Sequence, residues 1–202
     1  QLEEEKPDSG IKEAAKLLFF SRVGQLSLVS MVAGHVVMVG VMTMTPLHMK
    51  DGSHELEIIG FVISLHIVGM YAIAPVIGWL VDHIGAGPLL IAGGSLLFVG
   101  SELAAHTDKN DSLGGFVGLF LIGVGWSCGL IASSALLTKT FTGAERVRVQ
   151  GLADLIMTAS GGLAGIGSGL LVAGTDYQTM SHNAAFIGLV PIICYILFEV
   201  TK

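Results

Sequence analysis

Charged side chains are scarce in this sequence. Only 13% of its 202 residues are Asp, Glu, Lys or Arg, whereas 52% are hydrophobic. A water-soluble domain usually carries about 25% charged residues, so the composition argues against a soluble fold and indicates a bilayer as solvent. The ten Lys and Arg residues form no dense cluster, which excludes a nucleic-acid-binding surface.

Cysteines, cofactor motifs and a signal peptide are also missing or rare. Cys128 and Cys194 fall inside apolar runs without metal-ligand spacing, so we interpret them as small buried side chains and predict neither a metal site nor a cofactor. The absence of a Walker-type loop argues against ATP-driven transport, and the absence of an Asn-Pro-Ala signature argues against a water channel. The chain starts with Gln1 and has no apolar signal core, so we expect a piece of a longer protein.

What the sequence has in plenty is long apolar runs, of which six can cross the roughly 30 Å hydrocarbon core of a bilayer. We predict an all-α integral membrane fold, and Pro75 is expected to kink the second span because its ring displaces a backbone hydrogen bond. The predicted spans cover residues 23–47, 56–81, 88–105, 113–138, 151–174 and 184–200.

The first 22 residues are polar and are predicted to form a cytoplasmic linker. Pro7, Ser9 and Gly10 are expected to break regular structure up to about residue 11. Apolar residues at helical spacing over 12–22 favour a short amphipathic helix on the membrane surface. The same spacing fits a membrane-proximal extension of the first span equally well.

The basic residues predict the orientation of the spans. Six spans put both chain ends on one side, and with that side cytoplasmic eight basic residues lie inside and two outside. The inside set is Lys6, Lys12, Lys16, Arg22, Lys139, Arg146, Arg148 and Lys202, and the outside set is Lys50 and Lys109. Spans one to three and four to six then run in opposite directions, which allows a 3+3 inverted-topology bundle.

Small residues recur every four positions in two spans, a spacing that lets membrane helices approach closely. The fourth span carries Gly125, Gly129 and Ser133, and the fifth carries Gly161, Gly165 and Gly169. We predict one close helix contact for each. Static packing explains these faces unaided, and sliding during transport is the functional alternative.

Ionisable residues inside apolar runs are costly and therefore mark candidate sites. His35 lies near the middle of the first span, where it could carry a proton, bind substrate or simply hydrogen-bond a neighbouring helix. His66 in the second span is a weaker candidate of the same kind. Glu102 lies near the outer end of the third span, so we predict a solvated carboxylate.

Asp154 opens the fifth span in this prediction and follows Arg146 and Arg148 closely in sequence. That position suits a substrate-binding carboxylate. It suits a helix cap or a structural ion pair at least as well, because carboxylates are favourable near helix N-termini.

The segment Gly125-Trp126-Ser127-Cys128-Gly129 matches the Gly-x-Ser-x-Gly pattern of serine hydrolases, which raises an intramembrane protease as a remote alternative. Such a nucleophile needs a general base, and the last span contains no histidine. The pattern also follows no predicted strand. We therefore predict no catalytic residue and no enzyme.

Three segments together resemble the C-terminal half of a bacterial transporter of the major facilitator superfamily. The first is Gly78-x-Leu80-x-Asp82-x-x-Gly85 between the second and third spans, the second is the glycine-rich fourth span, and the third is the run 145–154. The superfamily loop continues with basic residues after the Asp and the second Gly, whereas this chain has His83, Ala86 and Gly87.

The resemblance implies secondary active transport of a small organic solute by alternating access, with drug or metabolite efflux as one form and protons as the coupling ion. It implies a bacterial cytoplasmic membrane and an N-terminal six-helix half as partner, with the lipid bilayer around both. Five residues are placed near the cavity by the resemblance: His35, Thr43, Trp126, Ser127 and Ser133. A stand-alone six-span channel or homodimer is the alternative.

The resemblance also implies a gating role for the Asp82 loop, although the missing basic residues leave Asp82 mainly as an acceptor. Its expected partners are the backbone N–H groups at the start of the fifth span, Arg146 or Arg148. Gly78 and Gly85 complete this predicted gating loop.

Overall fold

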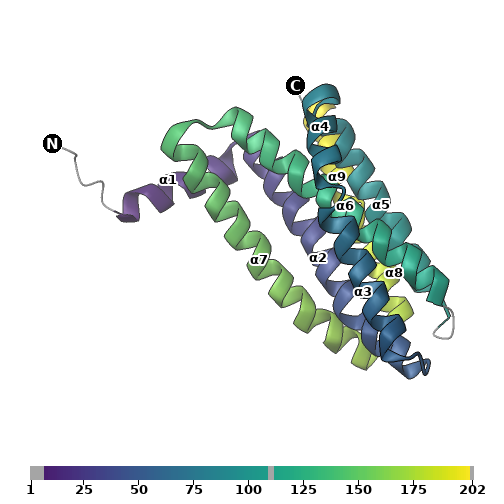
Figure 1. The fold of residues 1–202 in the computed structure, drawn as a ribbon. Helices are drawn as coiled ribbons and strands as arrows, with labels where there is room; N and C mark the ends of the chain where they lie inside the picture. The colour runs from purple at the N-terminus through teal and green to yellow at the C-terminus, as the bar shows by residue number, and fades with distance from the viewer. Residues whose placement is uncertain (1–6, 109–111, 201–202) are drawn as a thin grey trace.

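The computed structural model describes residues 7–108 and 112–200, and in this part of the chain every regular element is a helix. Lys6, Lys109 and Lys202, which enter the charge count, lie outside the described residues. The helices, shown in Figure 1, are α1 (Pro7–Phe20), α2 (Arg22–Asp51), α3 (Leu56–Tyr71), α4 (Ala74–Ile84), α5 (Ala86–His106), α6 (Ser112–Thr140), α7 (Gly143–Gly174), α8 (Tyr177–Gly188) and α9 (Val190–Val200).

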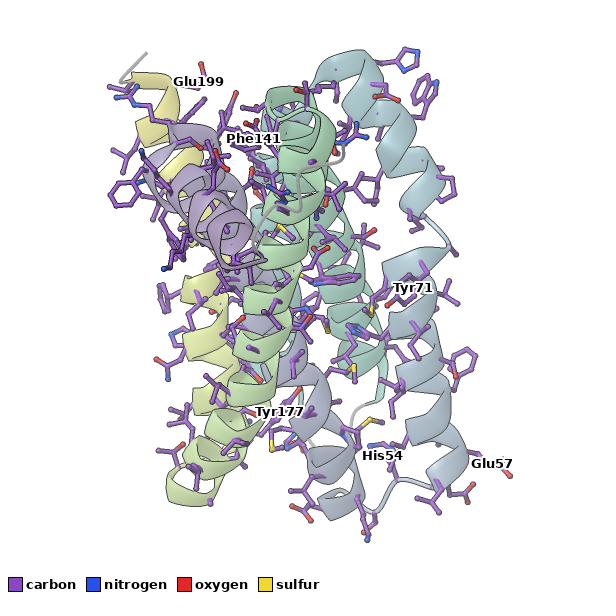
Figure 2. All side chains as sticks on the ribbon, turned by 90° about the vertical axis from the view of Figure 1, so that its left-hand side faces the viewer. His54, Glu57, Tyr71, Phe141, Tyr177 and Glu199 are labelled. Atoms are coloured by element: carbon purple, nitrogen blue, oxygen red, sulfur yellow. The ribbon has the colours of Figure 1, made fainter. Side chains whose placement is uncertain are left out.

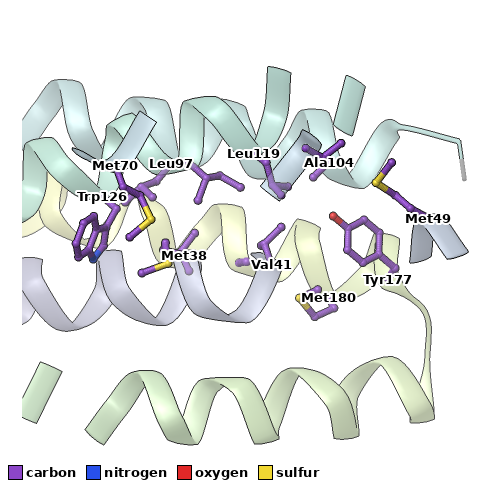
Figure 3. Close-up of a cluster of buried hydrophobic side chains, with 14 of the residues drawn as sticks. Met38, Val41, Met49, Met70, Leu97, Ala104, Leu119, Trp126, Tyr177 and Met180 are labelled. Carbon is purple, nitrogen blue, oxygen red and sulfur yellow. The ribbon is translucent and has the colours of Figure 1, made fainter. Parts of the chain in front are cut away.

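Some helices follow one another end to end, and each such pair, α3 with α4 and α8 with α9, is here called one rod, as is each other long helix. Six rods are long and apolar enough to cross a membrane. The predicted all-α fold with six spans is therefore confirmed. The α2 and α6 rods are the most buried, and α7 and the two broken rods expose most of their apolar surface. Figure 3 shows the largest apolar cluster, in which Met38 and Val41 of α2 meet Leu119 and Trp126 of α6.

Two glycine pairs bring α5 and α6 into close contact. A Cβ added at Gly125 would lie 2.8 Å from the Gly93 carbonyl oxygen, and one added at Gly100 would lie 2.7 Å from that of Gly118. Both distances are shorter than real Cβ contacts, so a side chain at either position would push the two backbones apart. Gly123 of α6 makes a similar contact with α3, where an added Cβ would lie 2.5 Å from the His66 carbonyl oxygen.

The predicted spans left residues 139–150 outside the fourth and fifth helices, and this boundary is wrong because α7 already begins at Gly143. Its early turns carry Val149, Ala153 and Met157 on one buried face. That face packs against Ala14 and Leu18 of α1, so burial stabilises helix where a polar loop was expected.

The first helix also begins earlier than predicted. Pro7 is its first residue, where a missing N–H costs nothing, and Gly10 lies inside it rather than breaking it. Gly10 fits there because the Arg148 side chain of α7 lies against it: an added Cβ would be 3.1 Å from the guanidinium carbon.

The last rod begins at Tyr177 rather than at residue 184. The Asp176 carboxylate caps α8 by accepting a hydrogen bond from the Thr179 N–H at 2.6 Å. This hydrogen bond lowers the pKa of the Asp176 carboxyl, because it favours the charged form. Tyr177, Met180 and Ala184 then continue a buried face, so the polar-looking segment TDYQTMSHN is mostly helix.

Pro75 lies at a complete break in the second rod, not at a kink in one continuous helix. The helix stops at Tyr71 and restarts at Ala74, with Pro75 in the first turn of α4. The proline therefore occupies a helix start, where its ring has no preceding turn to clash with. A similar interruption separates α8 from α9, where Pro191 follows Val190.

Candidate functional site

A histidine and a tryptophan meet between the two most buried rods. The Trp126 Nε1–H on α6 donates a hydrogen bond to His35 Nδ1 on α2 at 3.0 Å. An indole nitrogen can only donate, so His35 Nδ1 accepts and the neutral ring carries its proton on Nε2. Figure 3 shows the Trp126 side chain in this part of the core.

The other edge of the His35 ring faces α7 at Gly161. A Cβ added at Gly161 would lie 2.6 Å from His35 Nε2, so the ring occupies the space that any larger residue would need. His35 therefore contacts three rods through one side chain. It belongs to α2, accepts a hydrogen bond from Trp126 of α6 and packs against Gly161 of α7. A change in its protonation would act on all three.

Tyr71 extends this group toward the surface, and it was not among the residues predicted from the sequence. Its ring stands edge-on to Trp126 with the centroids 6.0 Å apart, and 60% of the residue is exposed. Tyr71 is the last residue of α3, next to the break before α4 (Figure 2). The available signal was an aromatic residue immediately before a proline-containing break.

The remaining predicted cavity residues divide into two kinds. Thr43 donates to its own helix at the Val39 carbonyl (2.8 Å) and lies 3.4 Å from Ser168 Oγ on α7, so it links α2 to α7. Ser127 and Ser133 are fully buried inside the bundle. They therefore line no open surface here, because the rods packed around α6 cover them.

A cavity of about 540 Å³ lies between α4, α6 and α7, at the end of the bundle where α4 meets α5, and several charged and polar side chains are among its lining residues. Exposed Asp82 lines one side, and Gln150 and Asp154 of α7 line another. The Gln150 side-chain amide donates to Asp154 Oδ1 at 2.9 Å and to Ser134 Oγ of α6 at 3.2 Å. Lys139 lines the same cavity.

The structure does not bring the predicted partners of Asp82 to it. Within the described residues Asp82 makes no hydrogen bond or ion pair, Arg146 is exposed, and Arg148 lies against Gly10 of α1. Both arginines lie in the first turns of α7, which begins at Gly143. Asp154 consequently lies about three turns inside α7 and cannot cap it.

The predicted glycine positions differ in how tightly they pack. Gly161 and Gly125 sit in contacts too close for a side chain, whereas Gly165, Gly169 and Gly129 have neighbours no nearer than 3.6 Å to an added Cβ. Gly85 has φ +89° in the turn between α4 and α5, a conformation that other residues rarely adopt. Around Gly78 an added Cβ would meet nothing within 4 Å.

Two further ionisable residues have partners that the sequence did not specify. His66 is fully buried, and its Nδ1 lies 2.7 Å from the Leu119 carbonyl oxygen, so it donates to that oxygen. Glu102 is not simply solvated: its carboxylate lies 2.8 Å from His182 Nδ1 and 3.5 Å from His106 Nδ1. The early start of α8 brings His182 over α5.

Comparison with known proteins agrees with this architecture. The family model described as Major Facilitator Superfamily matches residues 16–202, nearly the whole chain. The chain belongs to the major facilitator superfamily. No solved structure matches it at a significant level.

Two relatives of this superfamily chain come from Bacillus subtilis (strain 168), both named uncharacterized MFS-type transporters. YdeG is 35% identical over 167 residues and YddS 34% over 169, covering 82% and 83% of this chain. A protein of Brucella anthropi named riboflavin transporter RfnT is 29% identical over 162 residues, 77% of this chain. The match spans 39% of the length of each relative.

Members of the superfamily are generally carriers rather than enzymes. The side chains that meet at His35 in this chain are joined by a hydrogen bond. Within the described residues no group of three His, Cys, Asp or Glu side chains could hold a metal ion. Ser127 is buried, and the Nδ1 atom of His35 is already engaged by Trp126.

Proposed function

We propose that this chain forms the C-terminal half of a secondary transporter that moves a small organic solute by alternating access, coupled to protons. The hydrogen bond from Trp126 to His35 carries the proposal. It places a titratable, neutral ring deep between α2 and α6, in contact with a third rod at Gly161. Membership of the superfamily supports the transport class.

Aromatic and hydroxyl groups, rather than fixed charges, characterise the proposed solute site. Exposed Tyr71, the Trp126 edge behind it and Thr43 offer ring stacking and hydrogen bonds. Such groups suit an uncharged planar ring system. Because the relative RfnT is named a riboflavin transporter, riboflavin is the first solute to test.

The proposed partner is an N-terminal six-helix half. The rods that flank the α2 and α6 pair expose large apolar side chains, including Phe61 on α3 and Leu163 and Leu170 on α7, each at least 60% exposed. The relatives are longer than the matched region, which leaves room for such a half. The complete reading frame distinguishes this proposal from a stand-alone channel or homodimer.

Proton-coupled transport can be measured in everted membrane vesicles. Respiration acidifies their interior, and a dye such as acridine orange reports the gradient. Adding a solute that exchanges with protons should dissipate the gradient in vesicles that contain the transporter and leave it intact in empty vesicles. Right-side-out vesicles then separate export from import. If no aromatic solute, riboflavin included, moves protons or accumulates, the proposed function fails.

The proposed membrane is the bacterial cytoplasmic membrane, with both ends of this segment in the cytoplasm. The described basic residues support this orientation, because all but Lys50 lie on α1, at the start of α2, at the end of α6 or at the start of α7. Those positions share one end of the bundle.

Single cysteines test the orientation. In a background without Cys128 and Cys194, cysteines at exposed positions 55 and 175 should react with an impermeant maleimide on intact cells. Cysteines at exposed positions 84 and 142 should react only after permeabilisation. The reverse pattern would invert the proposed topology, and equal labelling at both ends would contradict a fixed orientation.

Asp82 is proposed to stabilise the state that is closed on the cytoplasmic side. It lines a cavity that also contains Lys139, and a group entering this cavity can meet its carboxylate. A charge-assisted hydrogen bond contributes about 1.5–3 kcal/mol, which shifts a two-state equilibrium about ten- to a hundredfold.

Asp82→Asn should therefore slow transport about tenfold or more while leaving solute affinity in the open state nearly unchanged. Equilibrium binding and vesicle transport measured on the same preparation separate the two effects. Glu145→Gln, an exposed carboxylate that does not line the cavity, serves as the control. Normal transport by Asp82→Asn would remove Asp82 from the gating mechanism.

A further inference from the structure

An apolar groove follows one face of the first half of α2. Near the start of α2 it forms a cavity of about 590 Å³ between α2 and α9, lined by Leu26, Val29, Leu197 and Phe198. A second cavity of about 370 Å³ continues from the same Val29. Because the two share a lining residue on one helix, they form a single groove.

The deeper part of the groove is entirely apolar. Its lining consists of Leu28, Val29, Val32, Ala33, Val36, Ile156, Ile187 and Val190, contributed by α2, α7, α8 and α9. The α8–α9 rod and α7 leave this stretch of α2 uncovered between them, and in Figure 2 the rod lies to the left of α7.

The mouth of the groove carries polar side chains, unlike its interior. Arg22 and Gln25 line the cavity at the start of α2, and Arg22 is exposed. The preceding helix α1 adds exposed Lys12 and Lys16. Exposed Glu13 of α1 and Glu199 of α9 oppose them, so positive charges outnumber negative ones at the approach to the mouth. Exposed Phe20 lies next to it and suits a membrane interface.

The length of the groove matches a lipid chain. From Leu26 to Val36 the α2 axis advances about 15 Å at 1.5 Å per residue. One leaflet contributes about half of the roughly 30 Å hydrocarbon core, which is also about 15 Å. An acyl chain that starts at the interface would therefore reach the end of the groove.

We propose that this groove binds one acyl chain of an anionic phospholipid, with the headgroup phosphate at Arg22 and Gln25. The bilayer surrounds the α2–α9 face with such chains, and the cationic mouth selects a negative headgroup. Neither Tyr71 nor Thr43 lines the groove, so this is a separate site from that of the transported solute. Its assignment to the cytoplasmic leaflet rests on the proposed orientation, whereas the lipid site itself does not.

Native mass spectrometry of the full protein, purified from membranes and delipidated in detergent, tests the headgroup preference. Dioleoyl-phosphatidylglycerol should bind at least about fivefold more tightly than dioleoyl-phosphatidylcholine, the effect of about one basic residue at a membrane surface. Arg22→Gln should remove most of this preference. Lys50→Gln, at the other end of the same helix, should retain it.

Glu199→Gln removes a negative charge, so its effect on lipid binding should be opposite to that of Arg22→Gln. Glu199 lies near the end of α9 and does not line the groove, so removing its negative charge should strengthen binding of phosphatidylglycerol. Val32→Phe, which narrows the deep part, should weaken binding of both lipids. A thermal unfolding curve for each variant shows whether it is folded.

Cys194 reports the location of the lipid, because it lines the groove whereas Cys128 is buried. Phosphatidylglycerol should slow its alkylation by N-ethylmaleimide several-fold, and phosphatidylcholine at the same concentration should slow it less. Equal binding of the two lipids, an unchanged preference in Arg22→Gln, or unprotected Cys194 would each overturn the proposal. Unreactive Cys194 in every lipid would mean that protein covers the groove, which also overturns it.

Discussion

Alanine at position 161 is expected to destabilise the bundle and to impair transport, whereas alanine at the adjacent position 162 should do neither. The added Cβ at Gly161 would overlap the His35 ring, with Nε2 only 2.6 Å away, while an added Cβ at Gly162 would meet nothing within 4 Å. Overpacking of this kind costs about 1–3 kcal/mol. Gly162→Ala should gain up to about 1 kcal/mol from its higher helix propensity.

Thermal unfolding in detergent measures both substitutions. A change of 1 kcal/mol corresponds to about 2–4 °C for a domain of this size, so Gly161→Ala should lower the midpoint by several degrees. The vesicle assay then compares transport by the two variants.

A double-mutant cycle identifies the cause of the Gly161 effect. In a His35→Ala background the space that the ring occupied is open, so Gly161→Ala should cost much less there than in the wild-type protein. If Gly161→Ala destabilises the protein equally with and without the His35 ring, the strain comes from elsewhere on α7. The proposed contact of His35 with three rods would then be wrong. Equal effects of alanine at 161 and 162 would contradict it as well.

His35→Asn is expected to make transport independent of pH across about pH 5–8, where histidine titrates. Protonation would place a proton on His35 Nδ1, the atom that now accepts the Trp126 N–H, so the charged ring cannot keep this hydrogen bond. Binding or release of a proton therefore alters the link between α2 and α6. Asparagine can still accept from Trp126 but cannot titrate.

Two further variants separate titration from hydrogen bonding. Trp126→Phe removes the donor and keeps His35 able to titrate, so transport should slow by up to about tenfold while its pH response persists. His35→Ala removes both and should weaken solute binding as well. Uptake and equilibrium binding at several pH values distinguish these results. Wild-type affinity and pH dependence in all three variants would show that the pair is structural.

The length and composition of the apolar runs were sufficient to predict six spans, because crossing a bilayer requires about 20 apolar residues whatever the fold around them. The Asp82 loop, the glycine-rich fourth run and residues 145–154 together were sufficient to indicate the superfamily. Helix ends were predicted less well. They depend on caps and packing partners such as Asp176 and the α1 face under Val149, and hydropathy measures neither.

The sequence also selected His35 and Trp126 separately, from polarity and from the superfamily resemblance. Only the tertiary structure joins them, because a hydrogen bond across 91 positions depends on how α2 and α6 pack. The same is true of Gly161 against His35, of Tyr71 at the helix break and of the cavity that Asp82 shares with Lys139. A chain's hydropathy determines which segments enter the bilayer, whereas the contacts between them are set by side-chain shape and by the few polar atoms that must find partners in the absence of water.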